Sequence, residues 1–453
     1  MLANHPDLVF AIIKLLAVLT PLNLVALLIL MERRGAAFIQ NRPGPARAAI
    51  VIPGVNLRLR GFGMIHNLSD GVKLFFKESI LPPFVNRWFY IIAPMIPLFT
   101  ALITPGLIPW FGPVSVEGAH GVISGSWFDA NSGILALFAI GSLSVYGVVL
   151  GSWASNSKYS LLGGMRASAM MISYEVSMGL SVLGLFLLIG SFSLTDAVQW
   201  QSQHTWGIFV QPIGFLLFLV AMFAETNRNP FDVAEGESEL VAGFHTEYSA
   251  MRFGLFMTGE YVHVIIASAL LATLYLGGYD LLPAGFLGVH TDSTFIARHL
   301  GVVLAIVLAV KALLLLGFSW LITGRQRRYA SLAASDRAAR TKEYGFYRIL
   351  LIVCALICVA LAALCYFKVH PQPVAMDGGT AIWSLWTSLG VIAVQFGTLV
   401  AKTLCFCWLF VWVRWTLPRF RYDQIMSLGW KWMLNIALVN LLVTAVIAKL
   451  VRG

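Results

Sequence analysis

Long apolar stretches, each of about eighteen residues or more, recur along almost the whole chain. Each of them is long enough to cross about 30 Å of hydrocarbon as an α-helix. A membrane β-barrel would instead need short segments in which apolar and polar residues alternate. Only 11% of the 453 residues are charged, whereas soluble domains usually contain about 25%. The sequence therefore predicts an all-α integral membrane protein.

Ten of these segments are predicted to span the membrane as helices. The first has no cleavage site of the kind that ends a signal peptide, so we expect it to be retained as a span. No repeat with a fixed period is found among the segments. The predicted spans lie near residues 8–30, 88–111, 132–154, 170–190, 206–224, 253–277, 300–322, 347–367, 383–412 and 430–450.

The segment between the first two spans contains an amphipathic stretch, residues 64–80. Its apolar residues share one face of a helix, and Asp70, Lys73 and Lys77 lie on the opposite face. A helix of this kind lies in the plane of the membrane surface and does not cross the bilayer. We therefore expect an interfacial helix here.

Basic residues concentrate in the loops after the first, third, seventh and ninth spans. By the positive-inside rule these loops face the cytoplasm, and both termini lie on the opposite side. The net charge of +10 is explained by these anchors, and we do not expect nucleic acid as a partner. The loop at residues 225–251 is the exception, because it is acidic and Arg228 is its single basic residue other than histidine.

The five cysteines show neither a CxxC motif nor metal-ligand spacing. Three of them, Cys354, Cys358 and Cys365, share one apolar run and are interpreted as packing residues. No haem or iron–sulfur ligand set is visible, so we expect any redox centre to be held by other subunits. We expect no metal site, and no nucleotide-binding GxGxxG motif follows a strand.

Several carboxylates lie inside or next to the predicted spans, where an ionised group costs about 3 kcal/mol or more. Closely spaced carboxylates cannot all ionise cheaply, so some would bind protons near neutral pH. The sequence therefore suggests a proton path from the acidic loop into the membrane. The alternative is a solvated loop with structural carboxylates that pair with Arg228 and Arg252. The carboxylates in question are Glu175, Glu225, Glu235, Glu237, Glu239 and Glu260.

Basic residues near the first span and in later spans allow two further interpretations. The end of the first span, with Glu32 and Arg33, could meet the amphipathic helix near Asp70 and form a mouth for an amphiphile, although basic flanks are more often topology anchors. Lys311 is interpreted as a structural or snorkelling residue. Lys402, also in an apolar run, is open to either a structural or a functional role.

Six segments resemble one protein family, in the order in which that family has them. The longest, AETNRNPFDVAEGESELVAGFHTEYSAMRF (224–253), is similar to the signature loop of the H-type membrane subunit of bacterial NADH–quinone oxidoreductase (respiratory complex I), the counterpart of the mitochondrial first core membrane subunit. The other five are ERRGAAFIQNRPGPARA (32–48), SDGVKLFFKE (69–78), SKYSLLGGMRASAMMISYEVSMGLS (157–181), TLYLGGY (273–279) and LPRFRYDQIMSLGWK (417–431).

The resemblance implies a multi-pass component of a proton-translocating oxidoreductase in the bacterial inner membrane. Such a component carries no redox centre of its own. It docks the peripheral arm, whose subunits carry flavin and iron–sulfur clusters, and it contacts other membrane subunits and lipids. It also forms the tunnel through which the quinone substrate enters. Matching motif positions assign to that tunnel Glu32, Arg33, Asp70, Lys73, Arg228 and Phe231.

The resemblance also assigns a proton path, on the cytoplasmic loop 225–251 and the nearby spans. Family members commonly have eight spans, so residues 281–382 are interpreted as an inserted hairpin of two spans. The insertion divides a core at 1–280 from the last two spans at 383–453. The carboxylates assigned to the path are Glu175, Glu225, Glu235, Glu237, Glu239, Glu247 and Glu260.

Smaller departures from the family pattern carry expectations of their own. Gly61 and Gly63 lie in a short expansion after the NRPGP motif. Ala234 and Gly236 stand where proline and alanine are usual, which predicts a looser acidic loop. Asn435 stands where a helix-bending proline is usual, which predicts a straighter last span.

Two other functions compete with the quinone enzyme. A homologous membrane subunit of an energy-converting hydrogenase or formate hydrogenlyase would couple ion transport to other redox chemistry. A stand-alone proton antiporter would show inverted repeats and broken helices near the midplane. The sequence shows no such repeat, and the acidic loop would then have no task.

Overall fold

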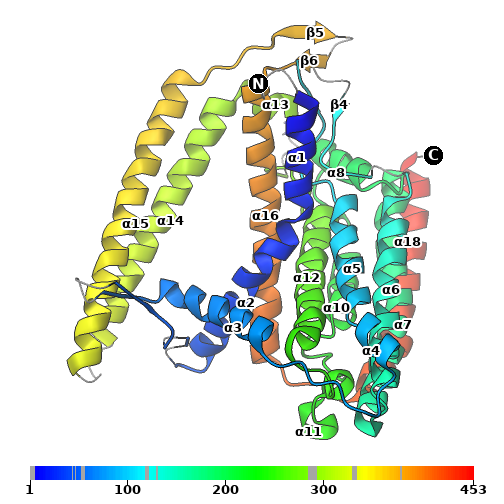
Figure 1. Cartoon of the computed structure of the whole chain (residues 1–453). Helices are drawn as coiled ribbons and strands as arrows, with labels where there is room; N and C mark the ends of the chain where they lie inside the picture. The colour runs from blue at the N-terminus through cyan, green and yellow to red at the C-terminus, as the bar shows by residue number, and fades with distance from the viewer. Residues whose placement is uncertain are drawn as a thin grey trace.

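The computed structural model of the chain is a bundle of long α-helices (Figure 1). It describes residues 6–42, 44–45, 47–52, 57–117, 122–128, 131–283, 293–328, 334–377 and 380–452. Within these ranges, nine helices are long and apolar enough to cross a membrane. The prediction of an all-α integral membrane protein is confirmed. The nine helices cover Pro6–Ile39, Arg87–Leu107, Gly133–Ala154, Lys158–Ile189, Ala250–Tyr275, Leu300–Gly324, Thr341–Lys368, Leu385–Thr416 and Tyr422–Leu450.

The predicted fifth span is shorter than expected, because its helix α10 runs only from Pro212 to Glu225. Proline has no backbone N–H and restricts the residue before it, so a helix begins readily at Pro212 and does not continue from Gln211. A separate short helix, α9 (Gly207–Val210), precedes it. The predicted fourth span, 170–190, also started too late, because helix α7 begins at Lys158 and ends at Ile189.

Two other spans are interrupted where proline lies near the break. The first consists of α1 (Pro6–Val18) and α2 (Thr20–Ile39), with Pro21 in the first turn of α2. The second consists of α4 (Arg87–Ile92) and α5 (Met95–Ile103), with Pro94 as the N-cap of α5. A proline removes one helical hydrogen bond, which permits such breaks.

The interfacial helix α3 covers Met64–Phe76 and stops before residue 80. Lys77 adopts an extended conformation, and the backbone N–H of Ile80 donates to Ser249 Oγ at 3.2 Å. The predicted boundary was therefore too late, because the chain leaves the helix to bond beside the start of α12. None of the side chains on α3 is fully buried.

Helix α12 (Ala250–Tyr275) lies at the centre of the bundle, packed against α2, α5 and α16 (Leu385–Thr416). Helix α7 packs against α6 (Gly133–Ala154), α10 and α18 (Leu434–Arg452). The start of α1 and the end of α18 lie at one end of the bundle, and α11 (Glu237–Leu240) lies at the other (Figure 1). The acidic loop therefore lies at the end of the bundle opposite to the start of α1 and the end of α18 (Figure 1).

Helices α14 (Leu300–Arg328) and α15 (Ala334–Lys368) form a hairpin at one side of the bundle (Figure 1). They pack on each other through a small cluster of Ala312, Ala355 and Cys358, which agrees with a packing role for that cysteine. The division of the chain at residues 281 and 382 stays a prediction.

The remaining elements are short and connect the long helices. In the described part of the chain the strands pair as antiparallel hairpins, β1 with β2, β3 with β4 and β5 with β6, and an isolated parallel bridge joins Val116 to Trp383. A π-helical turn, Leu428–Met433, joins α17 to α18. These elements are β1 (Ile50–Ile52), β2 (Leu57–Leu59), β3 (Val114–Ser115), β4 (Val122–Ile123), α8 (Leu194–Gln203), α13 (Ser293–Arg298), β5 (Ala375–Asp377), β6 (Thr380–Ile382) and α17 (Tyr422–Ser427).

Candidate functional site

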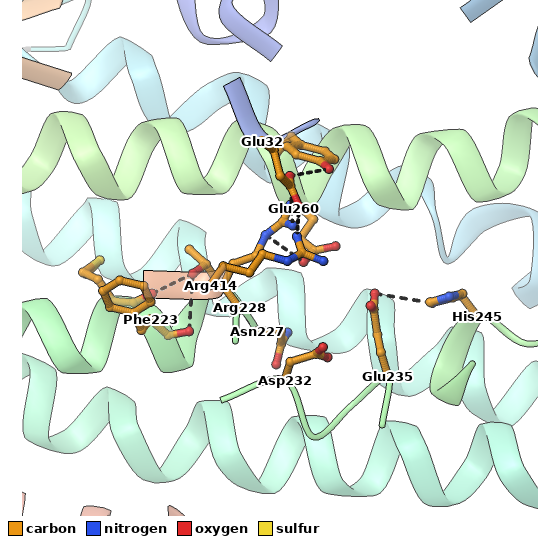
Figure 2. A network of polar contacts seen from close by, with 12 residues as sticks. Glu32, Phe223, Asn227, Arg228, Asp232, Glu235, His245, Glu260 and Arg414 are labelled. Carbon is orange, nitrogen blue, oxygen red and sulfur yellow. Dashed lines mark hydrogen bonds and ion pairs between the residues drawn. The ribbon is translucent and has the colours of Figure 1, made fainter. Parts of the chain in front are cut away.

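Arg228 is the centre of a buried cluster of charged side chains (Figure 2). It follows α10 closely, because Asn227 adopts a left-handed φ of 49° and turns the backbone after Glu225. The turn is closed by a hydrogen bond from the Arg228 backbone N–H to the Phe223 carbonyl, at 3.2 Å. Asparagine tolerates this conformation better than most residues. The turn places the Arg228 side chain, only 7% exposed, inside the protein.

Two carboxylates from different helices face this guanidinium. Arg228 Nη1 lies 3.7 Å from Glu32 Oε2, and its Nε lies 3.3 Å from Glu260 Oε1. Glu32 belongs to α2 and Glu260 to α12, so one arginine joins two spans that are far apart in the sequence. Its planar group presents several donors in a fixed fork, so Nη1 and Nε reach the two carboxylates from different positions, whereas a lysine offers a single compact charge.

Glu32 has two further partners. Arg414, from α16, forms an ion pair with Glu32 Oε1, and the Tyr261 hydroxyl donates to Oε2 at 2.7 Å. The Tyr261 ring also lies 4.3 Å from the Arg228 guanidinium carbon, within the range of a cation–π contact. A buried carboxylate requires such pairing, because removing a charge from water costs several kcal/mol.

The acidic loop continues this cluster towards the membrane surface. Asp232 pairs with Arg419 at 2.7 Å, and Glu235 lies 3.7 Å from His245 Nδ1. Burial raises the pKa of Glu235 well above its usual value, and the nearby carboxylates of Glu260 and Asp232 raise it further. Burial lowers the pKa of His245 to about 4. Burial therefore favours the uncharged form of both side chains.

Burial also raises the pKa of Asp232, although Arg419 opposes this shift. For Arg228, burial acts to lower the pKa, but the carboxylates of Glu260 and Glu32 outweigh it and the net shift is upward. The arginine thus stays charged, whereas Asp232 and Glu235 bind protons more readily than exposed carboxylates do. This is the electrostatic condition for groups that bind and release protons.

Two small cavities lie along the carboxylates inside the bundle. One is lined by Glu260, Glu225 and His263 among others, and the second by Glu225, His263 and Glu175 among others. Each has a volume of about 40 Å³, and a water molecule needs about 10–15 Å³ on this measure. Polar side chains and sufficient space make both cavities suitable for water. Glu225 is shared, so the two cavities connect Glu260 in α12 with Glu175 in α7.

The other predicted path residues differ in their environment. Glu239 is more than half exposed and pairs with Arg166 at 2.5 Å. Glu247 is partly exposed, and its backbone carbonyl accepts a hydrogen bond from Tyr90. The side chain of Glu237 lies outside the described residues. The structure therefore brings Glu235 and Glu260 to Arg228, and it leaves Glu239 on the surface of the protein.

The predicted mouth residues separate into two groups. Arg33 pairs with Asp70 of α3 at 2.5 Å, and both side chains are about 40% exposed. Lys73 is exposed on the same helix. Phe231 is buried, and its ring centroid lies 5.4 Å from that of Tyr174 and 5.8 Å from that of Phe420.

Several partners in the site were missed by sequence reasoning. Arg414 and Arg419 had been interpreted only as topology anchors, although they pair with Glu32 and Asp232. The LPRFR segment could have marked Arg419, whereas Arg414 precedes that segment and gave no signal. Tyr261 and His245 gave no signal, because their roles depend on contacts between distant segments.

A further cavity, of about 520 Å³, lies elsewhere. It is lined by Asp280, Trp383 and residues of α8, and by none of the predicted site residues. Within the described ranges, no group of three or more His, Cys, Asp or Glu side chains could hold a metal ion.

Known proteins resemble this chain over most of its length. The NADH dehydrogenase family matches residues 12–333 and 341–445. NADH-quinone oxidoreductase subunit 8 of Rhodothermus marinus is 36% identical over 96% of both chains. The H-type subunit of the same enzyme from Cytophaga hutchinsonii is 34% identical over 91% of this chain and 89% of its own. An H-type subunit from Geobacter sulfurreducens is 35% identical over 93% and 91%. The chain therefore belongs to the H-type subunit family of NADH-quinone oxidoreductase, as a multi-pass membrane component of that enzyme.

Proposed function

We propose that this subunit forms the membrane part of the quinone tunnel and couples quinone reduction to proton pumping through its buried carboxylates. The peripheral arm docks at the end of the bundle that carries the acidic loop. That end faces the cytoplasm, and both termini face the periplasm of a bacterial inner membrane. Flavin and iron–sulfur clusters belong to partner subunits, which deliver two electrons to the quinone. This chain supplies no redox centre.

The mouth of the tunnel is the junction of α2 and α3. Arg33 and Asp70 join the two helices at the surface, and Lys73 adds a second cation beside them. An isoprenoid quinone has a polar head and an apolar tail, which suits an amphipathic helix at the bilayer surface. Arg228, Glu32 and Phe231 then lie on the inner side of the tunnel.

Proton coupling begins when the quinone accepts two electrons and becomes anionic. Two protons complete the quinol, and the change in charge alters which loop carboxylates are protonated. Asp232 and Glu235 respond first, because they are buried and lie next to Arg419 and Arg228. The altered charge of the loop then changes which of the deeper carboxylates, Glu260, Glu225 and Glu175, carry a proton, by favouring one of two protonation states of the path over the other.

One observation carries this proposal: Glu225 lines both cavities and so links Glu260 with Glu175. A carboxylate in that position can receive a proton from one side and release it to the other. Structural carboxylates alone would not require two cavities with a shared acid. The names of the relatives favour the quinone enzyme over the hydrogenase-type subunit.

The test uses Glu225→Gln in the intact assembly, with quinone reductase activity and proton pumping measured separately. We expect both to fall by about a hundredfold or more, the scale on which a proton-transfer group contributes. The matched control is Asp196→Asn, on α8 at the opposite face, which should leave both unchanged. NADH oxidation with an artificial acceptor checks that the peripheral arm is assembled. Full activity together with full pumping in Glu225→Gln would contradict the proposal.

A further inference from the structure

The turn before α3, residues 60–63, connects three parts of the molecule. Three consecutive residues in it have positive φ: Gly61 at 55°, Phe62 at 54° and Gly63 at 101°. This conformation is strained for phenylalanine and persists only when the surroundings fix it. A Cβ on Gly63 would lie 2.8 Å from Pro45, so the turn is also tightly packed. Such a turn needs strong external contacts to hold it.

One set of contacts comes from α2. The Arg34 guanidinium donates twice to the Phe62 carbonyl, through Nε at 2.9 Å and Nη2 at 2.6 Å. Further along α3, Asn67 Nδ2 donates to the Ala26 carbonyl at 2.8 Å. Together with the Arg33–Asp70 ion pair, these bonds fix one side of α3.

A second set comes from α15 in the outer hairpin. Glu343 Oε1 accepts from the Arg60 backbone N–H at 2.7 Å, and Oε2 lies 3.1 Å from Arg60 Nη1. The Tyr347 hydroxyl accepts from the Gly61 backbone N–H at 2.8 Å and donates to Glu343 Oε1 at 3.0 Å. The Tyr347 ring also stacks on Phe62, with centroids 4.5 Å apart.

The Glu343 contacts are well shielded from solvent. The Glu343 side chain is 3% exposed and that of Arg60 is 12% exposed. Exposed ion pairs contribute little, but a buried pair with additional hydrogen bonds is strongly favoured over either charge alone. The predicted expansion near Gly61 and the outer hairpin, which the sequence predicts to be an insertion, therefore meet at one buried ion pair.

We propose that Glu343 and Tyr347 are positioning residues through which the outer hairpin fixes the start of α3, and with it the mouth of the quinone tunnel. The position of α3 depends on polar contacts because it has no fully buried side chain. Without the hairpin contacts, Arg60 would be left without its partner and the strained turn would relax. The link to the tunnel rests on the function proposed above, whereas the fixing of α3 does not.

The test uses Glu343→Gln and Tyr347→Phe in the intact assembly, with two independent readouts. Tyr347→Phe keeps the ring stack and is the milder change. Tyr366→Phe, exposed at the far end of the same helix, is the matched control. The first readout is hydrogen exchange of the backbone amides in residues 64–76. The second is the pair of constants KM and kcat, measured separately for quinones with a long and with a short isoprenoid tail.

We expect amide exchange of α3 to accelerate about tenfold in Glu343→Gln, the ratio that corresponds to 1.4 kcal/mol, and less in Tyr347→Phe. We also expect KM for the long-tailed quinone to rise about fivefold while its kcat stays unchanged, the pattern of weakened binding rather than weakened chemistry. Both constants for the short-tailed quinone should stay unchanged. Unchanged exchange in both variants would overturn the proposal. Faster exchange with unchanged KM would keep the fixing of α3 and refute the assignment of the tunnel mouth.

Discussion

Replacement of Arg228 by glutamine is the most direct test of the charged cluster. The variant leaves Glu32 and Glu260 buried near each other without the cation between them. At an effective dielectric constant of about 20, the contacts of 3.7 and 3.3 Å each correspond to roughly 4 to 5 kcal/mol of attraction. Removing one partner of a buried pair costs about 3–5 kcal/mol, because an uncompensated charge stays behind.

The protein can reduce that cost by binding a proton, so Arg228→Gln should change the pH dependence as well as the rate. Arg228 acts to lower the pKa of Glu235, and its loss should raise that pKa further. The alkaline limit of quinone reduction should then move to higher pH. We expect the quinone reductase activity of Arg228→Gln at neutral pH to fall about tenfold or more. Arg228→Lys should be intermediate, because lysine restores the positive charge without the fixed fork of guanidinium donors.

The assay compares NADH oxidation by quinone with NADH oxidation by an artificial acceptor, over a series of buffers from mildly acidic to alkaline pH. Arg421→Gln is the matched control, because Arg421 is 76% exposed and pairs only with exposed Asp423. Wild-type rates and an unshifted pH profile in Arg228→Gln would refute the reasoning.

Two further predictions concern single buried groups. Because the pKa of His245 falls from 6.5 to about 4 on folding, the unfolded loop binds a proton that the folded loop rejects between those values. The loop should therefore lose stability as pH falls through that window, by up to about 3 kcal/mol, relative to His245→Phe. Hydrogen exchange of residues 225–251 measures this, and equal acid sensitivity in both proteins would exclude it. Lys402 Nζ donates to the carbonyls of Leu276, Gly278 and Asp280 at 2.5–3.0 Å. Lys402→Met should lower the free energy of unfolding of the assembly by about 3 kcal/mol and with it the melting temperature, because three buried carbonyls lose their donor. Lys311→Met, at an exposed position, should leave both unchanged. Equal melting temperatures of the two variants would contradict a structural role for Lys402.

The spans could be predicted from the sequence because hydrophobicity and length determine them almost alone. The breaks near Pro21 and Pro94 were not predicted, although proline was visible, because a proline can bend, break or start a helix depending on its neighbours. The beginning of α7 was missed since its first turns are less apolar and extend the same helix beyond the predicted span.

The charged site shows a different limit. Arg33 was expected to meet Asp70, and the structure confirms this contact. Its neighbour Glu32 was expected at the same place, but successive helical residues point about 100° apart, so Glu32 faces Arg228 inside the bundle instead. The partner Arg414 lies almost 400 residues further along the chain, and no periodicity relates positions that far apart.

The two cavities beside Glu225 are separate and small, and this has a consequence for the electrical insulation of the membrane. A continuous water-filled pore would let protons return down the gradient, each releasing about 2.3 kcal/mol per 100 mV. Cavities of about 40 Å³ each hold no more than a few waters, too few for a water wire across the membrane. Under the proposed function, a proton would therefore cross only when a carboxylate exchanges its own proton, so that turnover and proton movement occur together.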